Sequence, residues 1–194
     1  LTAINDAFER LFYKGIPNEN GEDSIVITVN DTGASGSYGQ THVSRNTIDI
    51  WIHDRNDPAE ITAPEAVLAT VDFKTVIRGI HVTDVDVGDA RLSVSLSANF
   101  GRLSLNSLKG ISFSGTKDRG TGIRDTTMTF SGKIDDVNTA LFGLQYDCEA
   151  LDGCGEGNDM ILIEVVDFDN SGRDDTFSTK KNILVSIQRA AAAE

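Results

Sequence analysis

The sequence predicts an all-β protein, on three observations. Short segments alternate apolar and polar residues over four to eight positions, which is the pattern of half-buried antiparallel strands. Ile, Val, Thr and Phe are frequent in these segments, and Gly, Asn and Asp separate them. Only residues 4–13 and 134–146 have an apolar spacing that suits a helical turn, each with an Asn or Asp expected to cap it. The predicted strands lie at residues 24–31, 47–53, 90–98, 101–108, 126–132, 160–167 and 182–188.

The charge of the chain limits its partners. Among 194 residues, 30 are acidic and 17 are basic, so the net charge is −13. Such a surface repels nucleic acid and anionic membranes and attracts divalent cations. No apolar run approaches the ~20 residues that cross a bilayer, which predicts no membrane insertion. The first residues lack the features of a signal peptide, and we interpret the chain as a piece of a longer protein.

The chain has two cysteines, Cys148 and Cys154, which lie close together in "DCEALDGC". With no nearby His or further Cys they do not complete a tetrahedral zinc site. We therefore expect a small disulfide loop rather than free thiols. A disulfide indicates an oxidising, extracellular setting.

An internal repeat organises the chain. Setting Ile4 on Val137 brings Leu11 onto Leu144 and Tyr13 onto Tyr146. Further along, residues 23–29 fall on 159–165, residue 31 on 167, and 47–52 on 182–187. This predicts the C-terminal half of a repeat plus a linker in residues 1–57, a complete repeat in 58–189, and a tail in 190–194.

A half repeat has an apolar face without an opposing sheet. Three sources could cover this face: another chain, upstream sequence, or the complete repeat itself. The sequence leaves these alternatives open.

The complete copy resembles a known family through three blocks, which occur in the expected order. They are "GIHVTDVDVGDARLSVSLSANFGRLSLNSLKGISFSG" (79–115), "TTMTFSGKIDDVNTALFGLQYD" (126–147) and "NDMILIEVVDFDNSG" (158–172). They resemble the cadherin-like repeats of large extracellular surface and adhesin proteins. The resemblance implies a Greek-key β-sandwich of the cadherin or immunoglobulin-like type, with about seven strands, in a tandem array. It also implies an extracellular or cell-surface location.

The same resemblance implies calcium at the junction between consecutive repeats. The residues that it places around the ion come from the linker, from the following repeat and, by a loose match, from the half repeat. They are Asp54, Asn56, Asp57, Asp84, Asp86, Asp167 and Asp23. Independently, calcium takes six to eight oxygen ligands and tolerates irregular geometry. Asp84 and Asp86 are two residues apart, so in an extended stretch their side chains point the same way.

A second acidic stretch, "DFDNSGRDD" (167–175), resembles the first half of a calcium loop. The twelfth position holds Ser178 instead of the Glu that closes such a loop. We therefore favour a β-turn that provides Asp167 to the linker site.

Catalytic signatures are weak in this sequence, and we predict that the chain is not an enzyme. His42, His53 and His81 show no metal-ligand spacing, and Ser112 lacks the Gly two places later that a nucleophile elbow needs. The predicted function is a calcium-stiffened adhesion or scaffolding module. Its partners would be neighbouring repeats, a chain that completes the half repeat, or a surface protein or glycan.

Two alternative functions stay open. One is a carbohydrate- or matrix-binding β-sandwich with incidental calcium, in which Trp51 and Tyr38 form part of a sugar platform. The other is a fibre subunit whose half repeat is completed by a neighbouring chain.

Overall fold

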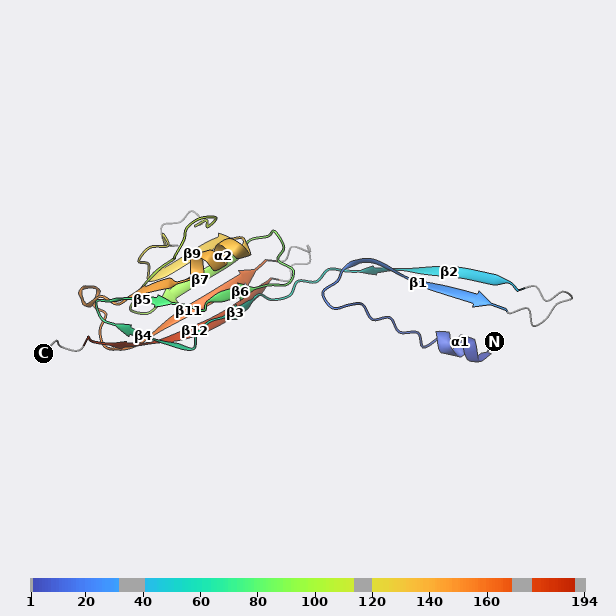
Figure 1. The fold of residues 1–194 in the computed structure, drawn as a ribbon, viewed down its shortest axis with the longest axis horizontal. Coiled ribbons are helices and arrows are strands. Elements are labelled where there is room, and N and C mark those ends of the chain that lie inside the picture. The colour runs from blue at the N-terminus through green and yellow to red at the C-terminus, as the bar shows by residue number, and fades with distance from the viewer. Residues whose placement is uncertain (1, 32–40, 114–119, 169–175, 191–194) are drawn as a thin grey trace. The chain divides into compact units, whose positions relative to one another are not determined.

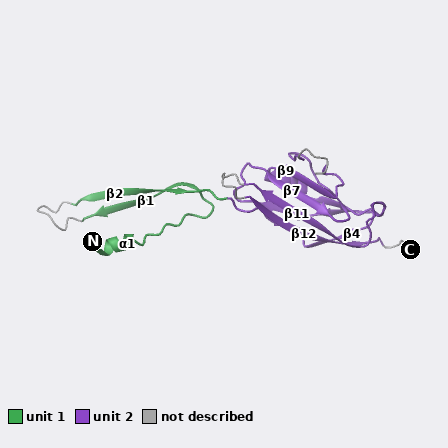
Figure 2. Ribbon diagram, turned by 180° about the vertical axis from the view of Figure 1, so that it is seen from behind, with its two compact units in different colours: residues 1–55 green, residues 56–194 purple. Residues whose placement is uncertain are grey.

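The computed structural model describes residues 2–31, 41–113, 120–168 and 176–190 (Figure 1). The chain divides into two compact units, residues 1–55 and residues 56–194 (Figure 2). The first contains α1 (Thr2–Phe8), β1 (Gly21–Asn30) and β2 (Val43–Ile52). The two strands pair antiparallel, from Gly21 opposite Ile52 to Asn30 opposite Val43. None of the described residues of this unit is buried.

The second unit is an all-β sandwich, as the sequence predicts. One sheet has five strands in the order β4-β12-β11-β7-β9, and the facing sheet has three in the order β5-β10-β8. β4 and β12 are parallel, and the other pairs are antiparallel. The bounds in the first sheet are β4 (Ala66–Thr70), β12 (Phe177–Gln188), β11 (Gly157–Asp167), β7 (Leu92–Ala98) and β9 (Thr127–Gly132). Those in the second are β5 (Lys74–Ile77), β10 (Leu144–Asp147) and β8 (Arg102–Ser104).

Two short strands and two helices complete this unit. A short ladder pairs β3 (Glu60–Thr62) with β6 (His81–Thr83). α2 (Ile134–Leu141) precedes β10, and a 3-10 helix (Ala150–Asp152) follows it. From β7 to β11 consecutive strands alternate between the two sheets, so the fold depends on contacts between residues distant in sequence.

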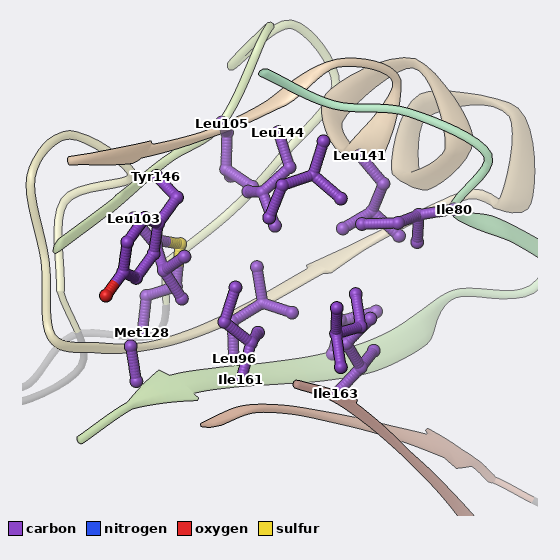
Figure 3. Close-up of a cluster of buried hydrophobic side chains, with 14 of the residues drawn as sticks. Ile80, Leu96, Leu103, Leu105, Met128, Leu141, Leu144, Tyr146, Ile161 and Ile163 are labelled. Atoms are coloured by element: carbon purple, nitrogen blue, oxygen red, sulfur yellow. The ribbon is translucent and has the colours of Figure 1, made fainter. Parts of the chain in front are cut away.

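The core lies between the sheets of the second unit. Along β7 the residues Leu92, Val94, Leu96 and Ala98 are buried, and the serines between them are half-buried. Figure 3 shows side chains from β8 and β10 pointing toward those from β7, β9 and β11, with Leu141 of α2 beside them. The period-two pattern therefore gives the strands their apolar face.

A buried polar network joins the two sheets. The Tyr146 hydroxyl donates a hydrogen bond to Asp159 Oδ2 (2.8 Å). Asp159 also accepts hydrogen bonds from the backbone N–H groups of Asn99 (2.9 Å), Phe100 (3.2 Å), Gly101 (2.8 Å) and Met160 (2.7 Å). A Cβ at Gly101 would lie 2.1 Å from Tyr146 Cε2, so the close approach of the ring requires glycine there. The network holds the turn between β7 and β8 against β11.

The sequence missed the shortest strands. The structure describes twelve strands, where alternation predicts seven: β3, β4, β5, β6 and β10 were not predicted, because strands of three to five residues are too short to show a clear period. Within 101–108 only Arg102–Ser104 is a strand. The predicted helical stretch 134–146 is helix only to Leu141, and β10 begins at Leu144. Gly143 between them has φ +78°, a conformation that glycine adopts without strain.

The helix cap differs from the expectation as well. The N-cap of α2 is Lys133, which makes no side-chain cap hydrogen bond. Asp135 and Asp136 lie inside the first turn. There the helix dipole favours negative charge, so these carboxylates stabilise the helix end without capping it.

The predicted disulfide is present. Cys148 and Cys154 are bonded, with Cα atoms 5.3 Å apart, and both are buried. Ion pairs hold the enclosed loop: Arg124 pairs with Glu149, and Arg124 Nη2 lies 3.1 Å and Arg102 Nε 2.7 Å from Asp152 Oδ2. This loop is fixed by both covalent and electrostatic contacts.

Candidate metal site

Three carboxylates converge at one place in the second unit. Asp84 and Asp86 lie in the turn that follows β6, and Asp167 is the last residue of β11. Each offers one oxygen, and these three oxygens lie within 4.8 Å of one another. The structure therefore brings together acidic residues that are about eighty positions apart in the sequence.

The turn after β6 fixes the two nearer carboxylates. Asp84 Oδ1 accepts hydrogen bonds from the backbone N–H groups of Asp86 (3.2 Å) and Val87 (3.1 Å). This is the local hydrogen bonding by which Asp stabilises turns. Val87 is buried and anchors the turn. One oxygen of Asp84 is thus committed to the turn, and the other is left for a further partner.

Buried acceptors without donors mark this site. Asp84 Oδ2 and Asp86 Oδ1 are buried and accept no hydrogen bond from any residue in the described parts of the chain. A buried carboxylate oxygen without a donor is unfavourable by about 1–3 kcal/mol or more. Both oxygens therefore need a proton, a water molecule or a cation.

The chain enters the second unit directly beside these carboxylates. β3 pairs with β6, with Glu60 opposite Thr83, and this ladder carries the preceding residues to the turn. The backbone N–H of Asp57 donates to Asp86 Oδ2 (2.7 Å). The Asn56 side chain, which is 5 % exposed, donates from Nδ2 to Asp167 Oδ2 (2.5 Å). Asn56 and Asp57 are consequently tied to the site through both side chain and backbone.

Ionisation of all three carboxylates is unfavourable at this site. Burial is the main cause, and together with the neighbouring carboxylates of Asp86 and Asp167 it raises the pKa of Asp84 to about 7. Backbone hydrogen bonding from Asp86 acts in the opposite direction and is outweighed. Two like charges 4 Å apart repel by about 1 kcal/mol in water and about 4 kcal/mol at an effective dielectric of 20. A bound cation would remove this repulsion.

The donor set suits a hard cation. All candidate ligand atoms are carboxylate or amide oxygens, and no His or Cys belongs to the group that the described residues form. Oxygen ligands favour calcium, magnesium or manganese over zinc or copper. The ligands come from a turn, a strand end and an entry segment, an irregular arrangement that calcium tolerates and magnesium does not. The residues present thus fit calcium best.

The remaining predicted ligands lie in the first unit. Asp54 is exposed near its end. Asp23 lies in β1, where its carboxylate accepts hydrogen bonds from the Tyr13 hydroxyl and from the Ser24 N–H, each at 2.7 Å. Both of its oxygens therefore have donors from their own unit. The role of Asp54 and Asp23 as calcium ligands stays a prediction.

Two further candidates from the sequence, the acidic stretch and the sugar platform, lie partly outside the described residues. Of the acidic stretch 167–175, which resembles part of a calcium loop, residues 169–175 lie outside the described residues. Trp51 lies in β2 and is 61 % exposed. Tyr38, its proposed companion in a sugar platform, also lies outside the described residues.

The network around Asp159 was not singled out from the sequence. A signal for it existed, because the repeat sets Tyr13 on Tyr146 and Asp23 on Asp159. A Tyr and an Asp that recur together at matched positions indicate a shared contact. Burial would raise the pKa of Asp159, but the hydrogen bonds from Gly101, Tyr146 and Met160 outweigh it and lower the pKa.

No protein-family model matches the chain, and no curated protein matches it. Among solved structures, the chain is similar to AggA, the major subunit of aggregative adherence fimbriae type I from Escherichia coli. The identity is 15 %, the TM-score 0.35, and the match covers 70 % of this chain and 99 % of that one. It is also similar to human mucin-like protocadherin EC1-2, with 8 % identity, a TM-score of 0.33, and coverage of 88 % and 85 %. Both TM-scores are below 0.5, so neither similarity decides the function.

Within the described residues, no helix is both long and apolar enough to pass through a membrane.

Proposed function

We propose that the chain is an extracellular adhesion or scaffolding module in which calcium stiffens the segment that enters the second unit. The ion would be held by Asp84, Asp86 and Asp167, with Asn56 and Asp57 as the entry-segment partners. The observation that carries the proposal is the pair of buried, donor-less oxygens on Asp84 and Asp86, within reach of Asp167.

Calcium would stiffen the entry segment because this segment, the turn after β6 and the end of β11 would share the ion. Asn56 and Asp57 already contact Asp167 and Asp86 by hydrogen bonds. In the absence of a cation, repulsion among the carboxylates weakens the attachment of the entry segment. With calcium bound, attraction replaces repulsion, and the backbone at residues 56–57 loses freedom to rotate. An array of such modules would change from a hinged chain to a rod.

The extracellular setting has independent support. The buried disulfide between Cys148 and Cys154 is of the kind that persists in oxidising compartments. Extracellular calcium is also abundant enough to fill weak sites, in the range of about 10⁻⁴–10⁻³ M. The acidic surface would keep the module soluble and attract the ion.

Trypsin offers a sharp test of stiffening, because Arg55 is exposed and directly precedes Asn56. We expect calcium to slow cleavage after Arg55 by about tenfold relative to a chelator. Lys14, exposed in the first unit, is the internal control, and cleavage after it should not change. Equal effects of calcium at both positions would contradict the proposal.

Binding itself is tested by calorimetric titration of calcium. The double variant Asp84→Asn/Asp86→Asn should lose binding. Asp89→Asn, which removes a fully exposed charge three residues away, should retain it. Saturable glycan binding that calcium does not affect and that Trp51→Ala abolishes would instead favour the carbohydrate-binding alternative.

A further inference from the structure

The first unit carries an uncovered apolar face. Val29 of β1 and Ile48 of β2 lie on this face, and α1 and the segment after it carry further large apolar side chains that are exposed. The set includes Ile4, Phe8, Leu11, Tyr13, Val29 and Ile48. Exposed apolar patches of this kind mark interaction surfaces in soluble proteins. What covers the face can be argued from the second unit.

The two units repeat the same contacts at matched positions. Asp23 pairs with Ile50 across β1 and β2, and Asp159 pairs with Val185 across β11 and β12, so the two ladders have the same register. The Tyr13 hydroxyl donates to Asp23 Oδ2 at 2.7 Å, and the Tyr146 hydroxyl donates to Asp159 Oδ2 at 2.8 Å. Residues 2–52 are therefore built as the back half of a sandwich of the second unit's kind.

The backbone N–H of the residue after each Asp makes the same contact in both units. The N–H of Ser24 donates to Asp23 Oδ1, and the N–H of Met160 donates to Asp159 Oδ1, both at 2.7 Å. Helix α1 corresponds to α2, since Ile4 matches Val137 and Phe8 matches Leu141.

In the second unit the matching positions are all covered. Ile163 of β11, Ile183 of β12 and Val137 of α2 are 0 % exposed, whereas their counterparts Ile27, Ile48 and Ile4 are half-buried or exposed. Strands of the front half, residues 58–132, lie beside this back half in the first sheet and belong to the facing sheet. β7 pairs antiparallel with the outer edge of β11, and β4 pairs parallel with the outer edge of β12.

Two local features of the first unit also differ from the second unit in the contacts that the front half supplies there. Leu11 and Tyr13 match β10, which pairs with β5 on one side and β8 on the other. In the first unit this segment is not a strand, and neither of the described strands of the unit, β1 and β2, pairs with it. Among the described residues, nothing in the first unit corresponds to the three N–H donors that residues 99–101 supply to Asp159.

We propose that this face binds a front-half segment with the strand pattern of residues 58–132, carried ahead of the first unit in the same polypeptide. Such a segment supplies a strand to each free edge of the β1–β2 pair and a turn to Asp23. A second copy of this chain offers no spare front half, because residues 58–132 already cover their own back half. The inference is independent of calcium and of the proposed function.

The test extends the whole 194-residue protein at its N-terminus with a further copy of residues 58–133. This joins a front half to Leu1 at the position where Lys133 joins Ile134. Amide hydrogen exchange in β1 and β2, measured with a chelator present, should slow by about a hundredfold relative to the unextended protein. An extension of equal length made of Gly and Ser is the control, and it should leave exchange unchanged.

Matched variants of the extended protein locate the contact. Ile27→Asp places a charge on the face that matches the buried Ile163, and it should abolish the slowing. Thr28→Asp, one residue along on the opposite face of β1, should retain it. In the unextended protein neither variant should change exchange, because the face is open there.

Three results would overturn the proposal. One is exchange in the extended protein that is as fast as with the Gly and Ser extension. Another is slow exchange in the unextended protein together with a dimer by light scattering, since a second copy would then cover the face. The third is slow exchange in an unextended monomer. A failure of calcium binding would affect none of these measurements.

Discussion

Replacement of Asp84 by Asn should have opposite effects on stability without and with calcium. The amide keeps the oxygen that accepts the N–H groups of Asp86 and Val87, so the turn is preserved. At pH 8, above the raised pKa of about 7, Asp84 is mostly ionised, and the variant then removes one of three negative charges whose oxygens lie within 4.8 Å of one another. In a chelator this relief should stabilise the second unit.

The magnitude follows from the distances. Each pair of charges at 4 Å repels by about 1 kcal/mol even with the full screening of water. Removing Asp84 eliminates two such pairs, so we expect about 1–2 kcal/mol of stabilisation in a chelator. At a free calcium concentration 100 times the Kd, binding stabilises the unsubstituted protein by about 2.7 kcal/mol. The variant loses most of that gain, so with calcium it should be less stable by about 1 kcal/mol.

Urea unfolding followed by far-UV circular dichroism measures both differences. The order of the midpoints should reverse between chelator and calcium. Asp89→Asn is the matched control, and its midpoint should shift by the same small amount in both conditions, because its side chain is 97 % exposed. Equal destabilisation of the Asp84 variant in chelator and in calcium would show that its charge is not the source of the repulsion.

Three further predictions concern the sandwich itself. Asp159→Asn leaves at least two buried or half-buried N–H donors without an acceptor. It should destabilise the second unit by about 2–6 kcal/mol, more than Tyr146→Phe, as measured by urea unfolding. Because the pKa of Asp159 is lowered below its usual 3.8, its contribution is complete above that pH and is lost as the pH falls through the lowered pKa. The lower stability of Asp159→Asn should make its acid unfolding begin at a higher pH. Because the variant has no carboxylate to protonate at this position, its unfolding free energy should fall less steeply with each pH unit than that of the unsubstituted protein. Replacement of Cys148 and Cys154 by Ser should lower the unfolding free energy by about 2 kcal/mol, which thermal unfolding with and without reductant will check.

The sequence predicts most of the sandwich because its longer strands bury one face. In β7 the apolar residues fall at every second position, and the structure buries each of them. β3 and β6, with three residues each, show no period and depend on pairing with each other. Their ladder is nevertheless what carries Asn56 and Asp57 to the carboxylates. Short strands of this kind are specified by tertiary contacts that a local pattern does not contain.

The sequence likewise predicts only part of the candidate site. The Asp84-Val-Asp86 spacing and the strand-ending Asp167 can be read from the sequence, and the structure brings these side chains together. The burial of Asp84 Oδ2 and Asp86 Oδ1 cannot be read from the sequence, because it depends on how the turn packs over Val87. Asp23 was predicted as a ligand from a loose match. The structure gives it a hydrogen bond from Tyr13, which the repeat would have predicted through Tyr146 and Asp159.

The most direct measurement is a crystal structure of the protein grown with calcium, with the ion located by its anomalous scattering. We expect an ion at about 2.3–2.6 Å from oxygens of Asp84, Asp86 and Asp167 together. Oxygens from Asn56 or Asp57 should complete its coordination. A structure in which saturating calcium leaves these carboxylates coordinated only by water or protons, or in which the ion binds elsewhere, would contradict it.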